Sequence, residues 1–215
     1  MDWVQIALTA AAFLASLSFH EAAHAWTAWR LGDYTGKAMG RVSLNPIRHI
    51  DPFGTILLPA LLWWSTGGRV VFGYAKPVPY NPYVLKNPSL GSAAIAAAGP
   101  GSNLLLATTC AILLGLASPG GVLGGSLGHH FLLLSISVNL YLALFNLLPL
   151  PPLDGGTVLA GLLGRDAQAA FARIETFGFI ILIVLMQTGF LGRVLHPAFD
   201  FLWEHLLALA GSIRG

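Results

Sequence analysis

Four apolar stretches in this sequence are each close to the length that crosses a lipid bilayer. They cover residues 3–29, 91–117, 127–148 and 174–191. A membrane-spanning helix needs about 20 mostly apolar residues. It must be a helix because every backbone polar group has to be bonded within the segment where water is absent. The sequence therefore predicts an all-α polytopic membrane protein with about four transmembrane helices.

The composition agrees with this class of protein. Hydrophobic residues make up 55% of the chain, charged residues 9%, and the mean hydropathy is +0.72, whereas about 25% of the residues in soluble domains are charged. The net charge of +2 is too small to indicate a nucleic-acid partner. Because 215 residues leave little room for a further module, residues 1–215 are predicted to form a single integral-membrane domain.

The segment between the first two spans, about 53–88, has a different pattern. GTILLPALLWW at 54–64 is too short to span alone, and β-branched and aromatic residues then alternate with Gly, Pro and Asn. Non-helical backbone at membrane depth is tolerated only where protein or water satisfies it. We therefore expect a re-entrant segment with a β-hairpin over roughly 69–82 that lines a cavity. A fifth span over about 54–72 is the alternative.

Basic residues indicate the orientation in the membrane. Lys and Arg collect between the first and second spans and between the third and fourth, whereas the loop at 118–126 carries no charge. The positive-inside rule then places the basic loops in the cytoplasm and the N-terminus outside. A span over 54–72 would divide the basic stretch between two sides, which counts against it. The tail from His196 has an apolar face interrupted by acidic residues, and we expect it to form an interfacial helix.

The first apolar stretch contains the sequence HEAAH at 20–24. Ionisable side chains inside a membrane are costly unless they bind a metal, pair or face water, so they are functional candidates. His20 and His24 are four residues apart, which puts both on one helix face within reach of a single ion. In the HExxH pattern the histidines bind zinc, and the glutamate takes a proton from the water that attacks a carbonyl. The sequence predicts that Glu21 has this role.

A third ligand is needed, because a catalytic zinc has three protein ligands and an open position. Asp154 is the leading candidate among the few carboxylates of the chain. It directly follows a span, in NLLPLPPLDGG, where prolines end the helix and glycines let the backbone turn closely. The alternative interpretation of LDGG is a turn with a helix N-cap.

The ordered set of motifs resembles the site-2 proteases, the intramembrane zinc metalloproteases of peptidase family M50. The motifs are HExxH at 20–24, GPGSN at 99–103 and NLLPLPPLDGG at 146–156, and GYAKPVPYNP at 73–82 resembles the compact bacterial branch. The resemblance implies a form without PDZ or CBS modules. It also implies one Zn²⁺ per chain, held by His20, His24 and Asp154.

The same resemblance assigns roles to other residues. It implies that Glu21 is the general base and that Asn146 orients substrate or stabilises the developing oxyanion. Asn103 is expected to bond the irregular segment or the substrate backbone. For both asparagines, an interhelical hydrogen bond is the alternative. Val70 and Val71 of the predicted hairpin are expected to pair with an unwound substrate backbone.

The implied reaction is hydrolysis of a peptide bond in or near the transmembrane segment of a membrane protein. Candidate substrates are anti-sigma factors and remnant signal peptides, in a prokaryotic cytoplasmic membrane. His20 is 17 residues after Trp3, or roughly 26 Å of helix, which places the metal in the cytoplasmic half of the bilayer.

Two other function classes are consistent with a zinc site in a membrane. One is a membrane zinc hydrolase that acts on a soluble or lipid-linked substrate, which would usually take a glutamate or histidine as third ligand. The other is a non-proteolytic membrane protein that binds zinc to assemble or to sense. Glu21 argues against the latter, because a structural zinc site needs no general base.

Overall fold

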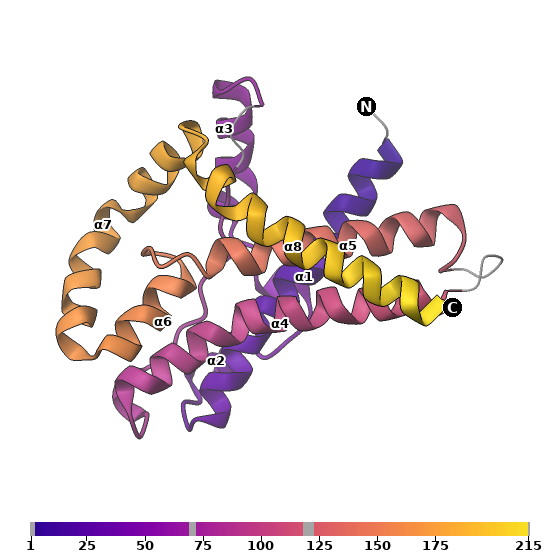
Figure 1. Ribbon diagram of the computed structural model, residues 1–215. Helices are drawn as coiled ribbons and strands as arrows, with labels where there is room; N and C mark the ends of the chain where they lie inside the picture. The colour runs from indigo at the N-terminus through magenta and orange to yellow at the C-terminus, as the bar shows by residue number, and fades with distance from the viewer. Residues whose placement is uncertain (1–2, 69–71, 118–122, 215) are drawn as a thin grey trace.

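The computed structural model describes residues 3–68, 72–117 and 123–214, and these contain helices and no strand (Figure 1). Short 3-10 turns lie at Pro46–Arg48 and Pro82–Val84, and a π-helical turn lies at Pro52–Leu57. The α-helices are α1 (Trp3–Arg30), α2 (Thr35–Ala38), α3 (Leu58–Ser65), α4 (Pro88–Leu116), α5 (Ser126–Asn146), α6 (Asp154–Leu163), α7 (Arg165–Gln187) and α8 (Phe190–Arg214).

Three of these helices, α1, α4 and α5, are long and apolar enough to cross a membrane. They confirm the predicted helical spans at 3–29, 91–117 and 127–148. Local sequence fixes their ends. The Asn87 side chain accepts a hydrogen bond from Leu90 N at the start of α4, where Pro88 takes the first position. Gly32, with φ of +103°, follows the end of α1, as expected of a helix stop.

The predicted fourth span, 174–191, falls on a bent helix. The parts of α7 at Asp166–Ile174 and Thr176–Gln187 meet at 63°, and together they bring the candidate spans to four. The helix ends four residues earlier than the apolar stretch does. Gly189 has φ of +69° and its N–H donates to the Met186 carbonyl oxygen, so the chain turns there before α8 begins.

The segment at 53–88 departs from the predicted hairpin in its described part. Residues 54–64 are helical, and residues 72–81 form no strand. Pro77 and Pro79 lack the N–H groups that a strand ladder needs, and the chain instead makes single bonds, from Tyr74 N to Gly54 O and from Lys76 N to His49 O. Val70 and Val71 lie outside the described residues. The re-entrant position of this segment stays a prediction.

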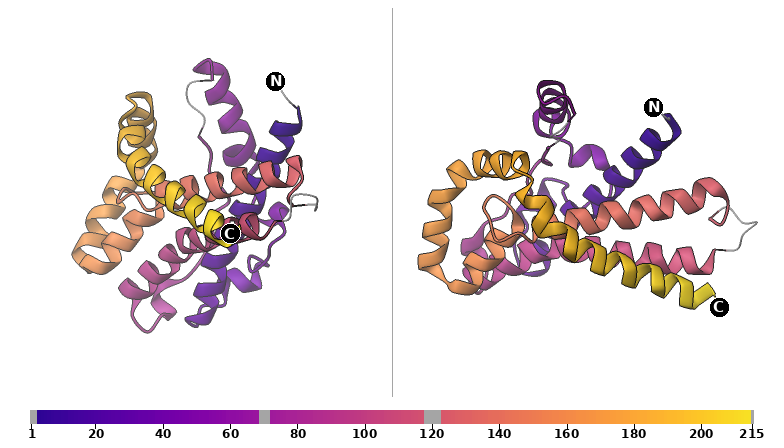
Figure 2. Two further views of the ribbon diagram at one scale, coloured as in Figure 1. Left: turned by 45° about the vertical axis from the view of Figure 1, so that its right-hand side comes forward. Right: turned by 45° about the horizontal axis from the view of Figure 1, so that its top comes forward.

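Helix α8 packs lengthwise against α4 and α5 (Figure 2). Its Phe199, Trp203 and Ala210 contact a cluster of buried residues from the other two helices: Ala107, Ala111, Leu114, Leu132, Ile136 and Leu140. The tail is therefore a helix, as expected, but protein covers its apolar face. This packing does not report where the membrane lies, so the position of α8 at the membrane interface stays a prediction.

Helix α6 is positioned by a close approach to α4. A Cβ atom on Gly161 would come within 2.5 Å of the Ser89 carbonyl oxygen and 2.8 Å of the Ala93 Cβ. Only glycine fits at this contact. It packs the last turn of α6 against the first turns of α4, while Asp154 begins α6 at its other end.

Candidate metal centre

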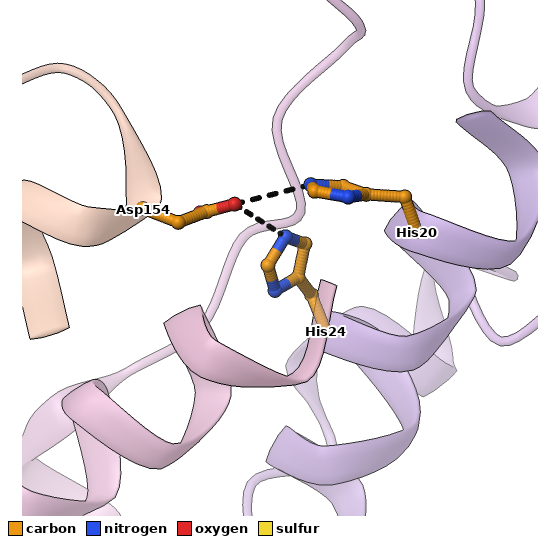
Figure 3. A group of neighbouring side chains, drawn as sticks. All are labelled: His20, His24 and Asp154. Carbon is orange, nitrogen blue, oxygen red and sulfur yellow. Dashed lines mark ion pairs between the residues drawn. The ribbon is translucent and has the colours of Figure 1, made fainter. Parts of the chain in front are cut away.

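Helix α1 carries two histidines, His20 and His24, one turn apart on the same face. Both are buried, with 5% and 8% of their surfaces exposed. Their ring centroids are 4.6 Å apart and the ring planes are nearly perpendicular, at 85°. The spacing of four residues shares a face because a helix turns once in 3.6 residues. The Nε2 atoms of both rings point toward α6 (Figure 3).

The Nδ1 atom of each ring is held by a hydrogen-bond acceptor. His20 Nδ1 donates to Asn103 Oδ1 at 2.6 Å, and His24 Nδ1 donates to the Ile95 carbonyl oxygen at 2.7 Å. Because both partners accept, the ring hydrogen is assigned to Nδ1 in each residue. Nε2 is left with a lone pair, which is the form of histidine that binds a metal ion.

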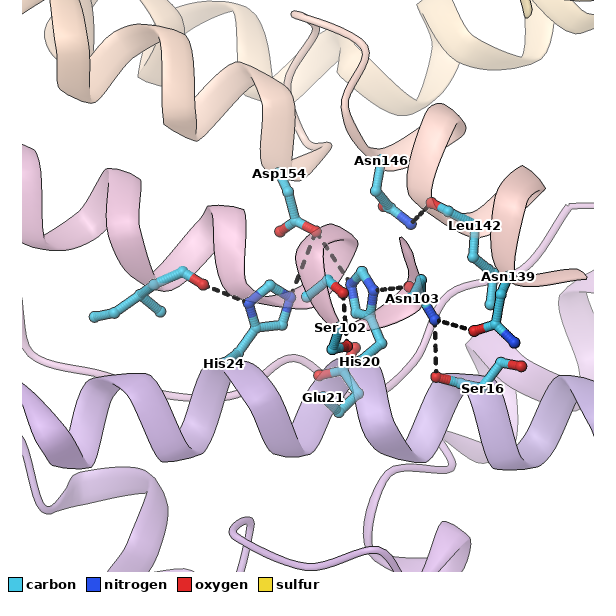
Figure 4. A network of polar contacts seen from close by, with 12 residues as sticks. Ser16, His20, Glu21, His24, Ser102, Asn103, Asn139, Leu142, Asn146 and Asp154 are labelled. Carbon is cyan, nitrogen blue, oxygen red and sulfur yellow. Dashed lines mark hydrogen bonds and ion pairs between the residues drawn. The ribbon is translucent and has the colours of Figure 1, made fainter. Parts of the chain in front are cut away.

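Asn103 is fully buried at the centre of a chain of amides (Figure 4). Its Nδ2 donates to the Ser16 carbonyl oxygen at 3.2 Å and to Asn139 Oδ1 at 2.8 Å. Asn139 Nδ2 donates in turn to the Ser135 carbonyl oxygen at 2.8 Å. Since Nδ2 of Asn103 already has two acceptors, its Oδ1 faces His20. The chain of amides joins α1, α4 and α5.

Asp154 begins α6 and reaches the histidines from the opposite side. Its Oδ2 lies 3.1 Å from His20 Nε2 and 3.4 Å from His24 Nε2 (Figure 3). The prolines of the turn at 147–153 prevent α5 from continuing. Gly155 then lets α6 start against the backbone of the same turn, where a Cβ atom would collide.

The three side chains converge as acceptors. One ligand atom from each lies within 4.8 Å of the others, and Asp154 Oδ2 is buried with no hydrogen-bond partner among the described residues. A buried carboxylate that faces two nitrogen lone pairs is unfavourable unless a metal ion or a proton lies between them. Two imidazoles and a carboxylate form a common zinc ligand set. In the described part of the chain, this is the one group of its kind that could hold a metal ion.

Gly99 gives the histidines the room that they need. A Cβ atom on this residue of α4 would come within 2.6 Å of His20 Nε2 and closer still to His24 Nε2. Real Cβ atoms do not approach that closely, so any other side chain would displace both rings. The GPGSN motif therefore contributes twice to the site, through the absent side chain of Gly99 and through the amide of Asn103.

Glu21 follows His20 and is also buried, with 8% of its surface exposed. Its Oε2 lies 3.8 Å from Nη2 of Arg41, a residue that is 3% exposed. The same Nη2 donates to the Lys76 carbonyl oxygen. Burial lowers the pKa of Arg41, and the Glu21 carboxylate opposes that shift. The predicted general base therefore has a buried cation as its neighbour.

The other predicted site residues have different surroundings. Asn103 makes the interhelical hydrogen bonds that were the alternative interpretation, and one of them holds a predicted metal ligand. Asn146 is the last residue of α5, and its Nδ2 donates to the Leu142 carbonyl oxygen of its own helix at 2.9 Å (Figure 4). Its role in substrate binding stays a prediction.

Two residues of this region were not singled out from the sequence. Asn139 lies one heptad before Asn146, and its amide position inside an apolar span is the signal that could have found it. Arg41 lies in a loop with several other basic residues, and that grouping indicated only the orientation in the membrane. Nothing in its local pattern predicts that it is buried.

Comparison with known proteins gives a consistent result. The profile of peptidase family M50 matches residues 124–188. The chain is 40% identical over 204 residues to YwhC of Bacillus subtilis, covering 93% of this chain and 89% of YwhC. It is 34% identical over 217 residues to Rip2 of Mycolicibacterium smegmatis, covering 96% of this chain and 79% of Rip2. Both relatives carry the name of a zinc metalloprotease. No solved structure gives a significant match.

The apolar helices, the group of two histidines and one aspartate, and these relatives define a class of protein, the membrane metalloproteases. Within that class the chain belongs to peptidase family M50.

Proposed function

We propose that this chain is a zinc-dependent intramembrane endopeptidase. It hydrolyses a peptide bond in or near the transmembrane segment of a membrane-protein substrate, in regulated intramembrane proteolysis. One observation carries the proposal: the Nε2 atoms of His20 and His24 face Asp154 Oδ2, while acceptors hold both Nδ1 atoms. These three residues would hold one Zn²⁺ per chain and leave a position open for chemistry.

The residues around the ligands divide the work of hydrolysis. When bound, zinc supplies a Lewis acid that activates water and polarises the peptide carbonyl. Glu21 takes a proton from the attacking water while the oxygen of that water bonds to the carbonyl carbon. It then gives the proton to the amine nitrogen as the C–N bond breaks. Asn103 keeps His20 in its metal-binding orientation. Asn146 orients the substrate or stabilises the oxyanion.

The segment at 72–81 supports binding of an unwound substrate. Tyr74 N–H donates to Gly54 O and Lys76 N–H donates to His49 O, both on the side of the preceding turns. In an extended chain the backbone N–H and C=O groups of successive residues point to opposite edges. We therefore expect Ala75 to present its N–H and C=O at the edge that faces away from the preceding turns. Strand addition there would recognise main chain more than side chain. Anti-sigma factors and remnant signal peptides are candidate substrates.

The proposed location is the prokaryotic cytoplasmic membrane, with the N-terminus outside and the site in the cytoplasmic half. It is supported by the basic residues between α1 and α4 and by their absence from 118–126. Cysteines introduced at the two ends of α1 and labelled with a membrane-impermeant maleimide in intact cells test this orientation. Labelling near Trp3, and not near Arg30, is expected.

The central experiment compares zinc content and cleavage of a transmembrane model substrate in detergent. Glu21→Gln should keep its zinc and lose cleavage, because the base is removed and the ligands remain. Asp154→Asn should lose most of its zinc and its cleavage. The matched controls are Glu204→Gln and Asp166→Asn, which change exposed carboxylates on α8 and α7. Both controls should behave as the wild type.

Other outcomes point to the other function classes. Full cleavage by Glu21→Gln would exclude the proposed base. Cleavage of a soluble peptide but of no transmembrane substrate would identify a membrane zinc hydrolase of another kind. Zinc binding without any cleavage, in wild type and controls alike, would indicate a non-proteolytic zinc protein.

A further inference from the structure

Arg41 is buried beside the predicted base, outside the group of metal ligands. Its side chain and that of Glu21 are 3% and 10% exposed, and Nη2 lies 3.8 Å from Oε2. A buried guanidinium is costly unless its charge is compensated. Among the described residues, this is the one ion pair in which the Glu21 carboxylate takes part.

The placement of Arg41 is set by the backbone on both sides of the pair. Its N–H donates to the Gly36 carbonyl oxygen, which anchors it to α2, and its Nη2 donates to the Lys76 carbonyl oxygen. Lys76 N–H donates in turn to the His49 carbonyl oxygen. The guanidinium therefore connects α1 to the segment at 72–81, which is the segment expected to bind substrate.

Two further donors of Arg41 point to a role beyond packing. Nε and Nη1 are buried without a hydrogen-bond partner among the described residues. A guanidinium used only for stability would be expected to satisfy its donors, since buried ion pairs contribute little unless their hydrogen bonds are complete. A general base, in contrast, needs a partner that fixes where its carboxylate points.

We propose that Arg41 is a positioning residue: held by the Lys76 carbonyl oxygen, its guanidinium directs the Glu21 carboxylate toward the metal centre. The inference rests on the proposed function, because it assumes that Glu21 is the base. Arg41 makes no hydrogen bond or ion pair with His20, His24 or Asp154 in the described structure. Its loss should therefore slow the chemical step without removing the metal.

The first test measures zinc content, kcat and KM of the full chain in detergent. Arg41→Met should keep the wild-type zinc stoichiometry and a KM within about 2-fold, with kcat lowered about 10- to 100-fold, the effect of a misplaced catalytic group. Arg41→Lys should recover part of kcat, because it restores the charge without the planar fork. Arg48→Met, which changes an exposed arginine nearby, is the control and should match wild type.

The second test does not need cleavage. Thermal unfolding midpoints of the chelator-treated protein are compared for wild type, Glu21→Gln, Arg41→Met and the double variant. Each single change leaves a buried group without its partner and should lower the midpoint. The midpoint of the double variant should fall by less than the sum of the two single shifts, because neither charge of the pair is then left buried without its partner. This coupling reports the pair itself.

Several results would overturn the inference. Wild-type kcat in Arg41→Met, or a raised KM with kcat unchanged, would exclude positioning of the base, and so would additive midpoint shifts. If Arg41→Met does not fold, kcat of Arg41→Lys decides, and a wild-type value there counts against the proposal. Failure of wild type to cleave, or cleavage by Glu21→Gln, would refute the proposed function instead, and the unfolding measurement would still test the pair.

Discussion

The Nδ1 atom of His20 lies 2.6 Å from Oδ1 of Asn103, a residue 83 positions later in the chain. This bond fixes the tautomer of the imidazole and its rotation about the Cβ–Cγ bond. The amide is itself fixed by Ser16 and Asn139. The candidate metal centre is therefore surrounded by a second set of buried polar groups. The effect of these groups on zinc binding can be tested separately from that of the proposed ligands.

Asn103→Leu should weaken zinc binding by about 10- to 100-fold, because His20, a proposed zinc ligand, loses the partner that orients it. The measurement is a zinc titration against a competing chelator in detergent. Thr108→Val is the control on the same helix, since the Thr108 hydroxyl bonds only the Leu104 carbonyl oxygen of its own turn in the described structure. Equal zinc affinity in Asn103→Leu and wild type would show that the bond is dispensable.

Asn139→Leu should have a smaller effect on the same titration, because it acts on His20 only through Asn103. We expect the double variant Asn103→Leu, Asn139→Leu to bind zinc about as weakly as Asn103→Leu alone, since residues of one network are not additive. Fully additive losses would mean that Asn139 affects the site by another route.

Gly99→Ala should abolish zinc binding, because its Cβ atom would occupy the space in front of both Nε2 atoms. Gly101→Ala is the matched control two residues away, where a Cβ atom would meet nothing within 4 Å. The control should be neutral or stabilised by up to about 1 kcal/mol from better helix propensity. Zinc content after purification distinguishes the two. Full occupancy in Gly99→Ala would contradict the close approach of α4 to the histidines.

Asp33→Asn should destabilise the region around the site by about 1–3 kcal/mol. The carboxylate is buried and accepts bonds from Thr35 N, Thr35 Oγ1 and Asn81 N, which tie the loop after α1 to the loop before α4. Burial raises the pKa of Asp33, but these bonds outweigh it, and its pKa lies below the ordinary value.

The sign of that shift predicts a pH dependence. A lowered pKa stabilises the fold above the ordinary pKa of an aspartate, and the contribution is lost as the pH falls through the lower, folded-state value. Thermal midpoints of wild type and Asp33→Asn should therefore differ at neutral pH and converge in acid. A constant difference across this range would exclude the ionised carboxylate as the source.

Gly115→Ala should destabilise the packing of α8 on α4. Its Cβ atom would come within 2.7 Å of the Ala210 carbonyl oxygen and 2.8 Å of the Ile213 Cβ. Gly211→Ala places a methyl group on α8 with nothing within 4 Å and serves as control. The comparison is made by thermal unfolding or by protease resistance of the tail. Equal stability of the two variants would place α8 elsewhere.

Length and apolar character were enough to predict three spans from the sequence, because a bilayer imposes about 20 residues on any helix that crosses it. The bend in α7 and the lengthwise packing of α8 were not predictable in this way. Both depend on contacts between distant segments, such as that of Gly115 with Ala210. The prediction of a hairpin is wrong in its described part. β-Branched residues indicate a strand only where backbone N–H groups are free to pair, and Pro77 and Pro79 have no such group.

The residues of the candidate site likewise divide into those that the sequence predicts and those that depend on contacts between distant segments. His20, Glu21, His24 and Asp154 stand out because ionisable groups are rare in apolar sequence. Asn139 and Arg41 do not, because their importance depends on which neighbour the fold brings to them. A hydrogen-bond partner more than 30 residues away has no signature in the local pattern of either residue.

The candidate metal centre would take two ligands from α1 and the third from the start of α6. A ribosome makes α1 first, and the chain must grow by 130 residues between His24 and Asp154. A nascent chain that has reached only the end of α5 therefore has an incomplete site. On the proposed function, proteolytic activity appears only after α4 and α5 have entered the membrane, so the order of synthesis keeps the unfinished enzyme inert among the other newly inserted helices around it.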